Sequence, residues 1–456
     1  MEELIISISG LRGLVGENFF EETAADFGRA FGTFLHHSST EEKRPSLAVG
    51  RDSRPSGAML FSAFASGLCA AGVDVIDLGL CSTPAVGVML RVLDCSGGAV
   101  ITASHNPLPY NGIKLLLADG VAPAKPIAEK IKKIFLDKNF ICRDPADCGR
   151  LSSDSRSAEI HVKKVLSIVQ PHRIAQKKFT VVLDSVNGAG GPEGTLLLEK
   201  LGCNVIGINQ KPTGLFAHTP EPTRENLTSL CRAVSEHKAD IGFAQDPDAD
   251  RLAVVDGAGR YIGEEFTLAL AAKYVFASNP GVAAANLSTS RMIDDVAAAA
   301  GGKVIRTPVG EANVAAAMIK NNCVIGGEGN GGVIDLRVGP IRDSLVAVAM
   351  ILDLMAQTGK IVGDLADEIG GYQMYKTKYR SDAQQAKTII EKTKKIFPDA
   401  QLNTSDGCRF DFHDGWLHIR TSNTEPIMRV ILETKDPAAA RQYLNTIESL
   451  CKDVLK

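Results

Sequence analysis

Short apolar runs alternate with longer helical patterns over most of the chain, which is typical of an α/β protein. Three successive segments each contain three such runs, which predict buried strands with helical stretches between them, such as 58–71 and 290–301. The nine predicted strands are 47–50, 73–76, 99–102, 181–184, 203–206, 241–244, 283–286, 302–305 and 323–326. We interpret this pattern as a threefold repeat, the alternative being a chance similarity of βα units.

In each segment a polar loop follows the third predicted strand. Because parallel sheets bind ligands at the carboxyl ends of their strands, three related modules would present these loops toward one cleft. From about residue 370 the pattern changes. Residues 381–384 predict a capping box that opens a helix to about 396, and Asp414-Gly415 predicts a hairpin between 408–413 and 416–420. A strand at 428–433 and an amphipathic helix at 437–455 complete a small α+β domain, and 361–371 is the predicted hinge before it.

Composition narrows the class of protein. The 456 residues carry 50 Lys+Arg against 53 Asp+Glu, a formal net charge of -3, which argues against a nucleic-acid or anionic-membrane partner. The apolar stretches are far shorter than the ~20 residues of a membrane-spanning helix. The 10 cysteines contain no C-x-x-C pair, so free thiols in a reducing compartment are expected. With an acidic N-terminus unlike a signal peptide, the expected location is the cytoplasm.

Two of the polar loops carry candidate catalytic chemistry. Ser104 directly follows a predicted buried strand, where its hydroxyl can serve as a nucleophile or phosphoryl carrier, or can simply cap a turn. Asp246, Asp248 and Asp250 alternate, so an extended chain would point all three carboxylates to one side. Three hard oxygen ligands suit Mg²⁺ or Ca²⁺, and the loop lacks the EF-hand pattern; solvated carboxylates in a turn are the alternative. The neighbouring Arg251 suggests a phosphate partner.

Two further loops have a composition fit for ligand binding. In the glycine-rich segment 327–332, Glu328 and Asn330 offer acceptors and donors for sugar hydroxyls, although a flexible turn would look alike. The segment 420–426, with Arg429 beyond it, combines a guanidinium, hydroxyls and an amide on a turning backbone, which is the chemistry of a phosphate clamp. A polar loop between two strands is the alternative.

Taken together, the loops resemble those of the α-D-phosphohexomutase family, in the same order and spacing, from end to end of the chain. The resemblance is carried by Thr102-Ala103-Ser104-His105-Asn106-Pro107, Asp246-Pro247-Asp248-Ala249-Asp250-Arg251, 327–331, 420–426, Ser9-Gly10-Leu11-Arg12-Gly13 and Gly50-Arg51-Asp52-Ser53-Arg54. It implies an α/β fold of three similar mixed-sheet domains and a C-terminal α+β domain around a central cleft. The expected limits are 1–150, 151–256, 257–368 and 369–456.

The resemblance also implies roles for individual residues. Ser104 would be phosphorylated and would bind one Mg²⁺ through its phosphate, together with Asp246, Asp248 and Asp250. The other implied catalytic residues are Arg12 and Arg251, which would neutralise phosphoryl charge, Lys114, which would assist proton transfer, and His105. The implied sugar-binding residues are Thr307, Glu328 and Asn330. The implied clamp for the phosphate that is not transferred consists of Arg420, Ser422, Asn423, Thr424 and Arg429.

The implied reaction moves a phosphoryl group between the 6- and 1-positions of a hexose phosphate, through a hexose 1,6-bisphosphate. Many relatives have serine and histidine where this chain has Asn330 and Gly332, and some have histidine in place of Glu311. These differences favour glucosamine 6-phosphate as substrate, with mannose and glucose phosphates as alternatives. A phosphatase or a non-catalytic sugar-phosphate sensor are more distant alternatives. The expected partner is the hexose phosphate alone, with no nucleic acid and no membrane, and the protein is expected to be a monomer or homodimer.

Overall fold

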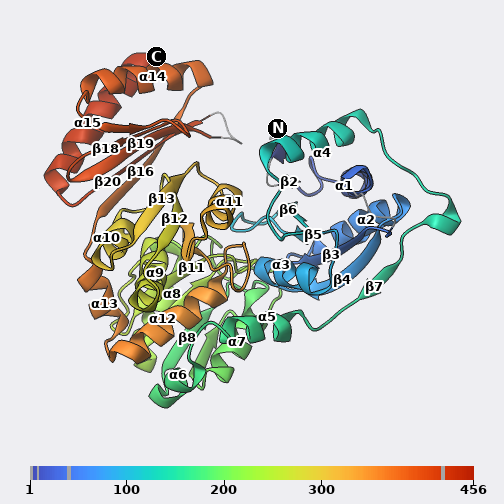
Figure 1. Cartoon of the computed structure of the whole chain (residues 1–456), viewed down its shortest axis with the longest axis horizontal. Helices are drawn as coiled ribbons and strands as arrows, with labels where there is room; N and C mark the ends of the chain where they lie inside the picture. The colour runs from blue at the N-terminus through green and yellow to red at the C-terminus, as the bar shows by residue number, and fades with distance from the viewer. Residues whose placement is uncertain (1–3, 8–9, 39–42, 423–426, 456) are drawn as a thin grey trace.

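The computed structural model describes residues 4–7, 10–38, 43–422 and 427–455. Four mixed or antiparallel sheets lie in chain order along it, each with its own helices. In Figure 1 the first (blue) lies at the right, the second (green) below, the third (yellow to orange) in the middle and the fourth (red) at the upper left. The predicted class, three similar α/β domains and a distinct C-terminal domain, is confirmed.

The first sheet is mixed and has seven strands in the order β1-β2-β6-β5-β3-β4-β7. Its elements are β1 (Ile5–Ser7), β2 (Gly10–Leu14), α1 (Glu21–Ser38), β3 (Ser46–Arg51), α2 (Gly57–Ala70), β4 (Asp74–Leu80), α3 (Thr83–Val92), β5 (Gly97–Ile101), β6 (Tyr110–Leu117), α4 (Lys125–Asp137) and β7 (Leu151–Ser153). Phe27, Phe31 and Phe64 of α1 and α2 pack against one face of the sheet. Val86 and Met89 of α3 pack against the other.

The second and third sheets have four strands each. The second domain contains α5 (Ser157–Leu166), α6 (Pro171–Lys177), β8 (Thr180–Asp184), α7 (Gly190–Lys200), β9 (Asn204–Ile208), α8 (Thr228–His237), β10 (Ile241–Gln245) and β11 (Leu252–Asp256). The third contains α9 (Glu265–Ser278), β12 (Val282–Asn286), α10 (Met292–Ala299), β13 (Lys303–Thr307), α11 (Glu311–Asn321), β14 (Ile325–Glu328), β15 (Gly332–Ile334), α12 (Ser344–Thr358) and α13 (Val362–Ile369).

The same strand arrangement occurs in all three domains. The first strand of each predicted trio (β3, β8, β12) lies between the other two and runs parallel to both. The third strand then pairs with an antiparallel strand that follows it directly, β6, β11 or β15. Each predicted strand overlaps an observed one, so the threefold repeat is confirmed. Its consequence is that the three polar loops occupy equivalent positions, between the third and fourth strands of each unit.

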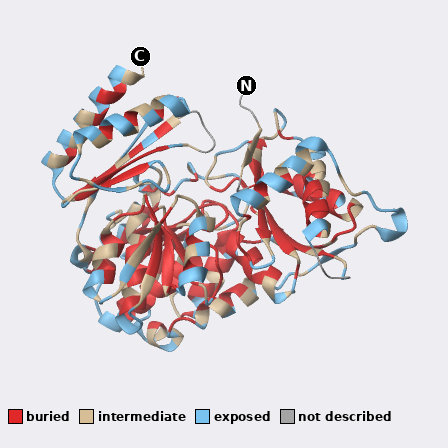
Figure 2. Cartoon of the chain, turned by 45° about the horizontal axis from the view of Figure 1, so that its top comes forward, coloured by how far each residue is buried: buried red, intermediate tan, exposed pale blue. Residues whose placement is uncertain are grey.

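The second and third domains share one hydrophobic core. Helix α12 is buried from Ser344 to Ala356 and packs with α9, α5 and α6. Figure 2 shows this buried material gathered around the central sheets, with exposed residues on the outer helices. No single described helix is long and apolar enough to cross a membrane, and α12 and α13 meet that criterion only as a pair bent by 93°. The polar loops of the second and third domains are therefore supported by one shared core.

The C-terminal domain is an antiparallel sheet in the order β16-β20-β19-β18-β17, covered by two helices. Its elements are β16 (Gln373–Arg380), α14 (Ala383–Ile396), β17 (Gln401–Asn403), β18 (Cys408–Asp411), β19 (Gly415–Thr421), β20 (Ile427–Thr434) and α15 (Pro437–Val454). The predicted hairpin at Asp414-Gly415 is confirmed. The capping box forms one residue later than predicted, between Asp382 and Gln385. Most of 361–371, predicted as a hinge, is helix α13.

Arg291, which precedes α10 in the third domain, holds the C-terminal domain in place. Its guanidinium donates to the Asp411 carboxylate at 3.0 Å and to the Gly415 carbonyl at 2.9 Å. Its backbone N–H donates to Glu433, which also accepts from the Trp416 indole. Because these groups come from three strands, β18, β19 and β20, the docking fixes the whole sheet against the third domain.

Candidate active site

Ser104 sits in the loop between β5 and β6 with a left-handed backbone, φ 51°. That conformation is uncommon for a residue with a Cβ and marks a site whose surroundings hold it in place. The side chain is buried, and its Oγ donates to Oδ2 of Asp246 at 2.9 Å, across 142 residues of sequence. The candidate phosphoryl carrier and the candidate metal loop are therefore in direct contact.

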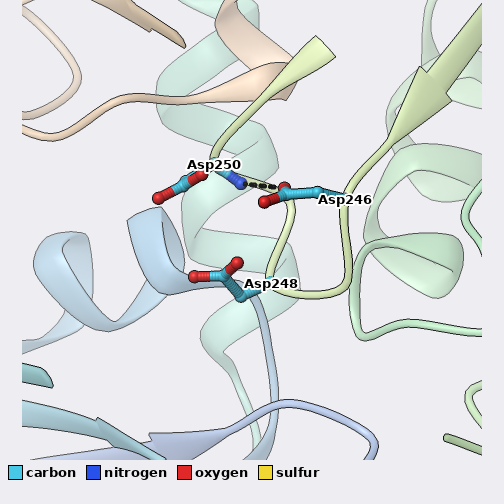
Figure 3. A group of neighbouring side chains, drawn as sticks. All are labelled: Asp246, Asp248 and Asp250. Carbon is cyan, nitrogen blue, oxygen red and sulfur yellow. Dashed lines mark hydrogen bonds between the residues drawn. The ribbon is translucent and has the colours of Figure 1, made fainter. Parts of the chain in front are cut away.

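Asp246, Asp248 and Asp250 converge on one point, as Figure 3 shows. Each offers a carboxylate oxygen within 4.8 Å of the others, and all three are fully buried. The expectation of an extended chain is wrong, because the segment is a turn with Ala249 at φ 54°. The turn is closed by the Asp250 N–H, which donates to Oδ1 of Asp246 at 3.1 Å. The carboxylates therefore meet through turn geometry and not through strand alternation.

Two oxygens of this cluster fit a bound cation. Oδ1 of Asp248 and Oδ1 of Asp250 are buried and have no hydrogen-bond partner among the described residues. A buried carboxylate oxygen without a donor is costly, whereas a divalent metal prefers such hard oxygen ligands. Burial, followed by the charges of Asp250 and Asp248, raises the pKa of Asp246 well above its usual range. A metal ion would relieve this repulsion, so the three residues fit the group that the sequence implies.

Two basic side chains partly neutralise the cluster, Lys114 from β6 and Arg251 from the aspartate loop itself. The Lys114 ammonium, on β6, lies 2.6 Å from Oδ2 of Asp248 and 3.2 Å from Oδ2 of Asp250. Although burial lowers the pKa of Lys114, these two carboxylates raise it above its ordinary value, so the amine carries its proton. Arg251 lies 3.6 Å from Oδ1 of Asp250. Both predicted residues therefore contact the candidate metal loop.

His105 and Arg12 lie on the carrier side of the site. Nδ1 of His105 is 3.4 Å from the Ser104 Oγ, and Arg12 donates to Oδ1 of Asn106 at 2.7 Å. The charge of Arg251, together with burial and Arg12, holds the pKa of His105 well below its ordinary value. The imidazole is therefore neutral near pH 7. Arg12, Lys114 and Thr102 also line a small cavity of about 90 Å³ beside the carrier loop.

Arg342, which the sequence analysis did not single out, connects the metal loop with the predicted sugar loop. Its guanidinium donates to Oδ2 of Asp250 at 2.6 Å and to Oε2 of Glu328 at 2.7 Å. Glu311 accepts from the Arg342 backbone N–H at 2.7 Å. The sequence carries no clear signal for this role, because Asp335, Arg337 and Asp343 place other charges close to Arg342 in the chain.

Glu328 ends β14 and is almost fully buried. Besides Arg342, it accepts from Nδ2 of Asn286 at 2.7 Å and from the Gly310 N–H at 3.2 Å. Asn330, in the same loop, has a buried Oδ1 without a hydrogen-bond partner in the described part of the chain. The Thr307 hydroxyl, at the end of β13, donates to its neighbour's carbonyl at 3.0 Å. Of the three predicted sugar ligands, Asn330 therefore has the clearest unmet hydrogen-bonding capacity.

The predicted phosphate clamp lies where β19 ends and β20 begins, at the turn end of the hairpin. Arg420 and Arg429 face each other across the two strands, an arrangement of like charges that an anion between them would stabilise. Arg420 also donates to Asp406 at 2.9 Å. The Ser422 N–H donates to the Ile427 carbonyl, closing the hairpin at 2.8 Å. Asn423 and Thr424 lie outside the described residues.

A chain of hydrogen bonds runs from the clamp to the metal loop. Asp406, the partner of Arg420, also accepts from the Val309 N–H at 3.0 Å, and the next residue along the chain, Gly310, donates to Glu328. Glu328 is joined in turn to Asp250 through Arg342. The four loops predicted from the sequence therefore form one connected site that involves all four domains.

The first domain also buttresses the metal loop through the N-terminus of α3. Thr83 donates from its hydroxyl to Oδ2 of Asp248 at 2.6 Å and from its N–H to the Asp248 carbonyl. The preceding residue, Ser82, donates to Glu193. Glu193 contacts Nδ1 of the buried His161 at 3.3 Å, and Nε2 of His161 lies 2.7 Å from Asp343. This ion cluster ties together three domains directly behind the metal ligands.

Comparison with known proteins identifies the family. Successive parts of the chain match the family models for phosphoglucomutase/phosphomannomutase alpha/beta/alpha domains I (4–141), II (159–259) and III (264–372) and for the C-terminal domain (380–450). A "Phosphoglucomutase/phosphomannomutase" of Thermococcus kodakarensis is 39% identical over 98% of both chains. A "Probable phosphoglucosamine mutase" of Pyrococcus abyssi is 34% identical over 98% of both.

Among solved structures, a phosphoglucomutase/phosphomannomutase family protein from Burkholderia thailandensis matches with a TM-score of 0.87 at 28% identity. The match covers 99% of this chain and 98% of that one. Sequence, domain order and overall structure therefore agree along the full length described. The chain belongs to the phosphoglucomutase/phosphomannomutase family, the α-D-phosphohexomutases, and is an enzyme of the mutase type, an isomerase that transfers a phosphoryl group within its substrate.

Proposed function

We propose that this enzyme interconverts the 6- and 1-phosphates of a hexose through a phosphorylated Ser104 and a hexose 1,6-bisphosphate. The observation that carries the proposal is the 2.9 Å contact between the Ser104 Oγ and Asp246. It joins a nucleophilic oxygen to a cluster of three buried carboxylates, two of which have an oxygen without a hydrogen-bond partner among the described residues. Phosphoryl transfer depends mainly on such positioning and charge neutralisation.

In the first half-reaction the bond between phosphorus and the Ser104 Oγ breaks as the free hydroxyl of the sugar phosphate forms a bond to the same phosphorus. The hydroxyl loses its proton in this step and the Ser104 Oγ gains one as its bond to phosphorus breaks, and Lys114 assists this proton transfer. Asp246, Asp248 and Asp250 would hold Mg²⁺, which supplies charge neutralisation at the transferred phosphoryl oxygens. Arg12 and Arg251 add further positive charge beside Ser104.

The bisphosphate must then turn end for end and return its other phosphoryl group to Ser104. Each orientation leaves one phosphate away from the reacting serine, so a second phosphate-binding site is required. Arg420 and Arg429 are suited to this task because they place two guanidinium groups on one face of the hairpin. Glu328, Asn330 and Thr307 are the proposed contacts of the sugar ring between the two phosphates.

For the sugar, we propose glucosamine 6-phosphate, converted to glucosamine 1-phosphate. Several relatives at 34% identity are named probable phosphoglucosamine mutases, including those of Pyrococcus abyssi and Methanopyrus kandleri. Mannose and glucose phosphates are the second candidate, which is supported by the relative of 39% identity named phosphoglucomutase/phosphomannomutase. Comparing kcat/KM for the glucosamine, mannose, glucose and N-acetylglucosamine phosphates decides between them.

The mechanism is tested with Ser104→Ala and a sugar 6-phosphate carrying labelled phosphate. We expect wild type to form the sugar 1-phosphate with little free phosphate, and intact-mass measurement to detect one phosphoryl group that Ser104→Ala lacks. The variant should lose turnover. Turnover retained by Ser104→Ala would refute the phosphoserine route, and free phosphate as the main product would favour a phosphatase.

A further inference from the structure

Arg54 lies in the segment between β3 and α2 and is completely buried at its side chain. Its guanidinium uses all three nitrogens. Nε donates to Oδ2 of Asp52 at 3.0 Å, whereas the two terminal nitrogens donate to three backbone carbonyls of the β5–β6 loop and to that of the first residue of β6. Those carbonyls are Ser104 at 2.6 Å, Asn106 at 2.6 Å, Tyr110 at 2.9 Å and Pro107 at 3.3 Å. A single side chain therefore hydrogen-bonds to most of the turn that carries Ser104.

Asp52 is connected to the same loop through Thr102, which lies two residues before Ser104. The Thr102 hydroxyl donates to Oδ2 of Asp52 at 2.6 Å and accepts from the Ser104 N–H at 2.9 Å. The Ser104 carbonyl, as described, accepts from Arg54. Both backbone polar groups of Ser104 are thus connected to one buried ion pair, one through Thr102 and the other directly.

This connection accounts for the unusual backbone of Ser104. A non-glycine residue at φ 51° persists only where surrounding contacts over-determine it. A fork of five N–H donors in one plane can fix several carbonyl directions together, which a lysine ammonium cannot do in the same way. The direction of the Ser104 side chain toward Asp246 therefore depends on the geometry of Arg54.

The second domain packs against Arg54 and its neighbour Ser53. The Phe216 ring lies 4.9 Å from the Arg54 guanidinium carbon, and the Ser53 hydroxyl donates to the Asn187 carbonyl at 2.7 Å. A Cβ on Gly214 would lie 2.0 Å from the Ser53 carbonyl oxygen, so the 214–216 segment packs directly against the Arg54 segment. Arg54 thus lies between the carrier loop and the domain that supplies the metal ligands.

We propose that Arg54, held by Asp52, is a positioning residue for phosphoryl transfer. It touches neither substrate nor the reacting atoms, but it fixes the loop so that the Ser104 Oγ points at the metal carboxylates. The inference rests on the proposed function of Ser104. A misplacement of about 1 Å at a reacting atom costs on the order of 100-fold in rate. We therefore expect the loss of Arg54 to lower kcat and not to affect sugar binding.

The test compares Arg54→Lys and Arg54→Ala with Arg51→Lys and Arg51→Ala. Arg51 ends β3, three positions before Arg54, but it pairs with Asp77 at 3.1 Å and its guanidinium lies over the Phe61 ring. For Arg54→Lys, which keeps the charge beside Asp52, we expect kcat to fall about 100-fold, with KM within about twofold of wild type and a thermal midpoint close to it. The Arg51 variants should retain wild-type kcat.

Thr102→Val provides a variant that leaves the guanidinium intact. It removes the hydroxyl between Asp52 and the Ser104 N–H, so it should also lower kcat with little change in KM, and combining it with Arg54→Lys should cost less than the product of the two effects. Phosphoserine formed on these variants should release free phosphate faster than on wild type, because a displaced loop leaves its phosphorus more open to attack by water.

The inference is overturned if Arg54→Lys and Thr102→Val both keep kcat within about twofold of wild type, or if Arg51→Lys loses as much as Arg54→Lys. It is also overturned if the loss of activity follows only a loss of folded protein, as measured by the thermal midpoint. Failure of the proposed function is distinguishable, because Ser104→Ala would then remain active whatever the Arg54 variants do.

Discussion

Arg342 donates to the metal-loop carboxylate of Asp250 at 2.6 Å and to the sugar-loop carboxylate of Glu328 at 2.7 Å. A single buried guanidinium therefore links the candidate metal loop to the predicted sugar loop. Asp250 owes its low pKa to this contact, because Arg342, followed by Lys114, outweighs the raising effect of burial.

Arg342→Gln is the first prediction. The amide keeps some hydrogen bonding but removes the charge that balances Asp250 and Glu328, so Mg²⁺ affinity or kcat/KM should fall roughly 10–100-fold, as for other partners of metal ligands. Calorimetric titration with Mg²⁺ and steady-state kinetics measure the two effects. Arg337→Gln is the control, since Arg337 is half exposed and pairs only with Asp335 among the contacts described. Equal effects of both substitutions would contradict the role of Arg342.

The second prediction concerns the metal. Chelation with EDTA should abolish turnover and Mg²⁺ should restore it, whereas Asp248→Asn should be inactive and should fold. Mg²⁺ should raise the thermal midpoint of wild type, because a ligand that binds only the folded state stabilises it, and should not raise that of Asp248→Asn. Asp367→Asn, which changes an exposed carboxylate of α13, should behave as wild type. A full Mg²⁺ response in Asp248→Asn would place the metal elsewhere.

Arg420→Ala tests the phosphate clamp. Charge-assisted hydrogen bonds contribute about 1.5–3 kcal/mol each, so KM for the sugar phosphate should rise roughly 10–100-fold. Phosphorylation of Ser104 by a sugar bisphosphate at saturation should change little. The matched control is Arg441→Ala on the exposed side of α15. An unchanged KM in Arg420→Ala would show that the distal phosphate binds at another place.

His161 gives a prediction for pH. Although burial lowers its pKa, Asp343 and Glu193 raise it to about 10, above the ordinary value of 6.5. The stabilisation from the charged imidazole is therefore complete below about pH 6.5 and is lost as the pH rises through about 10. His161→Gln should cost about 3–5 kcal/mol near neutral pH, because it leaves two buried carboxylates without their cation.

Urea unfolding of wild type and His161→Gln between pH 6 and 10.5 measures this effect. The difference in unfolding free energy between the two proteins should shrink toward the alkaline end. The exposed His237, at the end of α8, is the control site for a His→Gln change, which should leave the whole curve unaltered. A difference that stays constant over this pH range would mean that His161 is neutral in the folded protein.

The sequence predicted the repeated strands and the four loops because these features are local. A buried strand such as 181–184 is a run of apolar residues, and the polar loop after it is visible directly in the order of residue types. The strands β6, β11 and β15 were not predicted. Residues 115–117 of β6 and 252–255 of β11 are apolar runs like those of the predicted strands, whereas β15 is short and begins with glycine. Each of the three pairs as an antiparallel neighbour with the strand that precedes it.

The sequence predicted the candidate ligands of the site, but it did not predict the residues that hold those ligands in place. Ser104 and the aspartates stand in recognisable motifs, whereas Arg342 and His161 have no local signature, because their partners lie 92 and 182 residues away in the chain. The shape of the aspartate loop was also missed. Alternation suggests a strand, but the left-handed Ala249 turns the chain instead, and only tertiary packing selects between the two.

The equivalent positions of the three polar loops have a consequence for how such an enzyme can diversify. In the proposed function, the loop of the first unit holds the phosphoryl carrier, the loop of the second holds the cation ligands and the loop of the third holds the carbohydrate contacts. On that proposal, a substitution at Asn330 or Glu311 would alter which sugar is accepted while Ser104 and Asp246 keep their arrangement, because the latter belong to other copies of the unit. Because the three loops belong to separate copies of the same structural unit, the accepted sugar could change without loss of phosphoryl transfer.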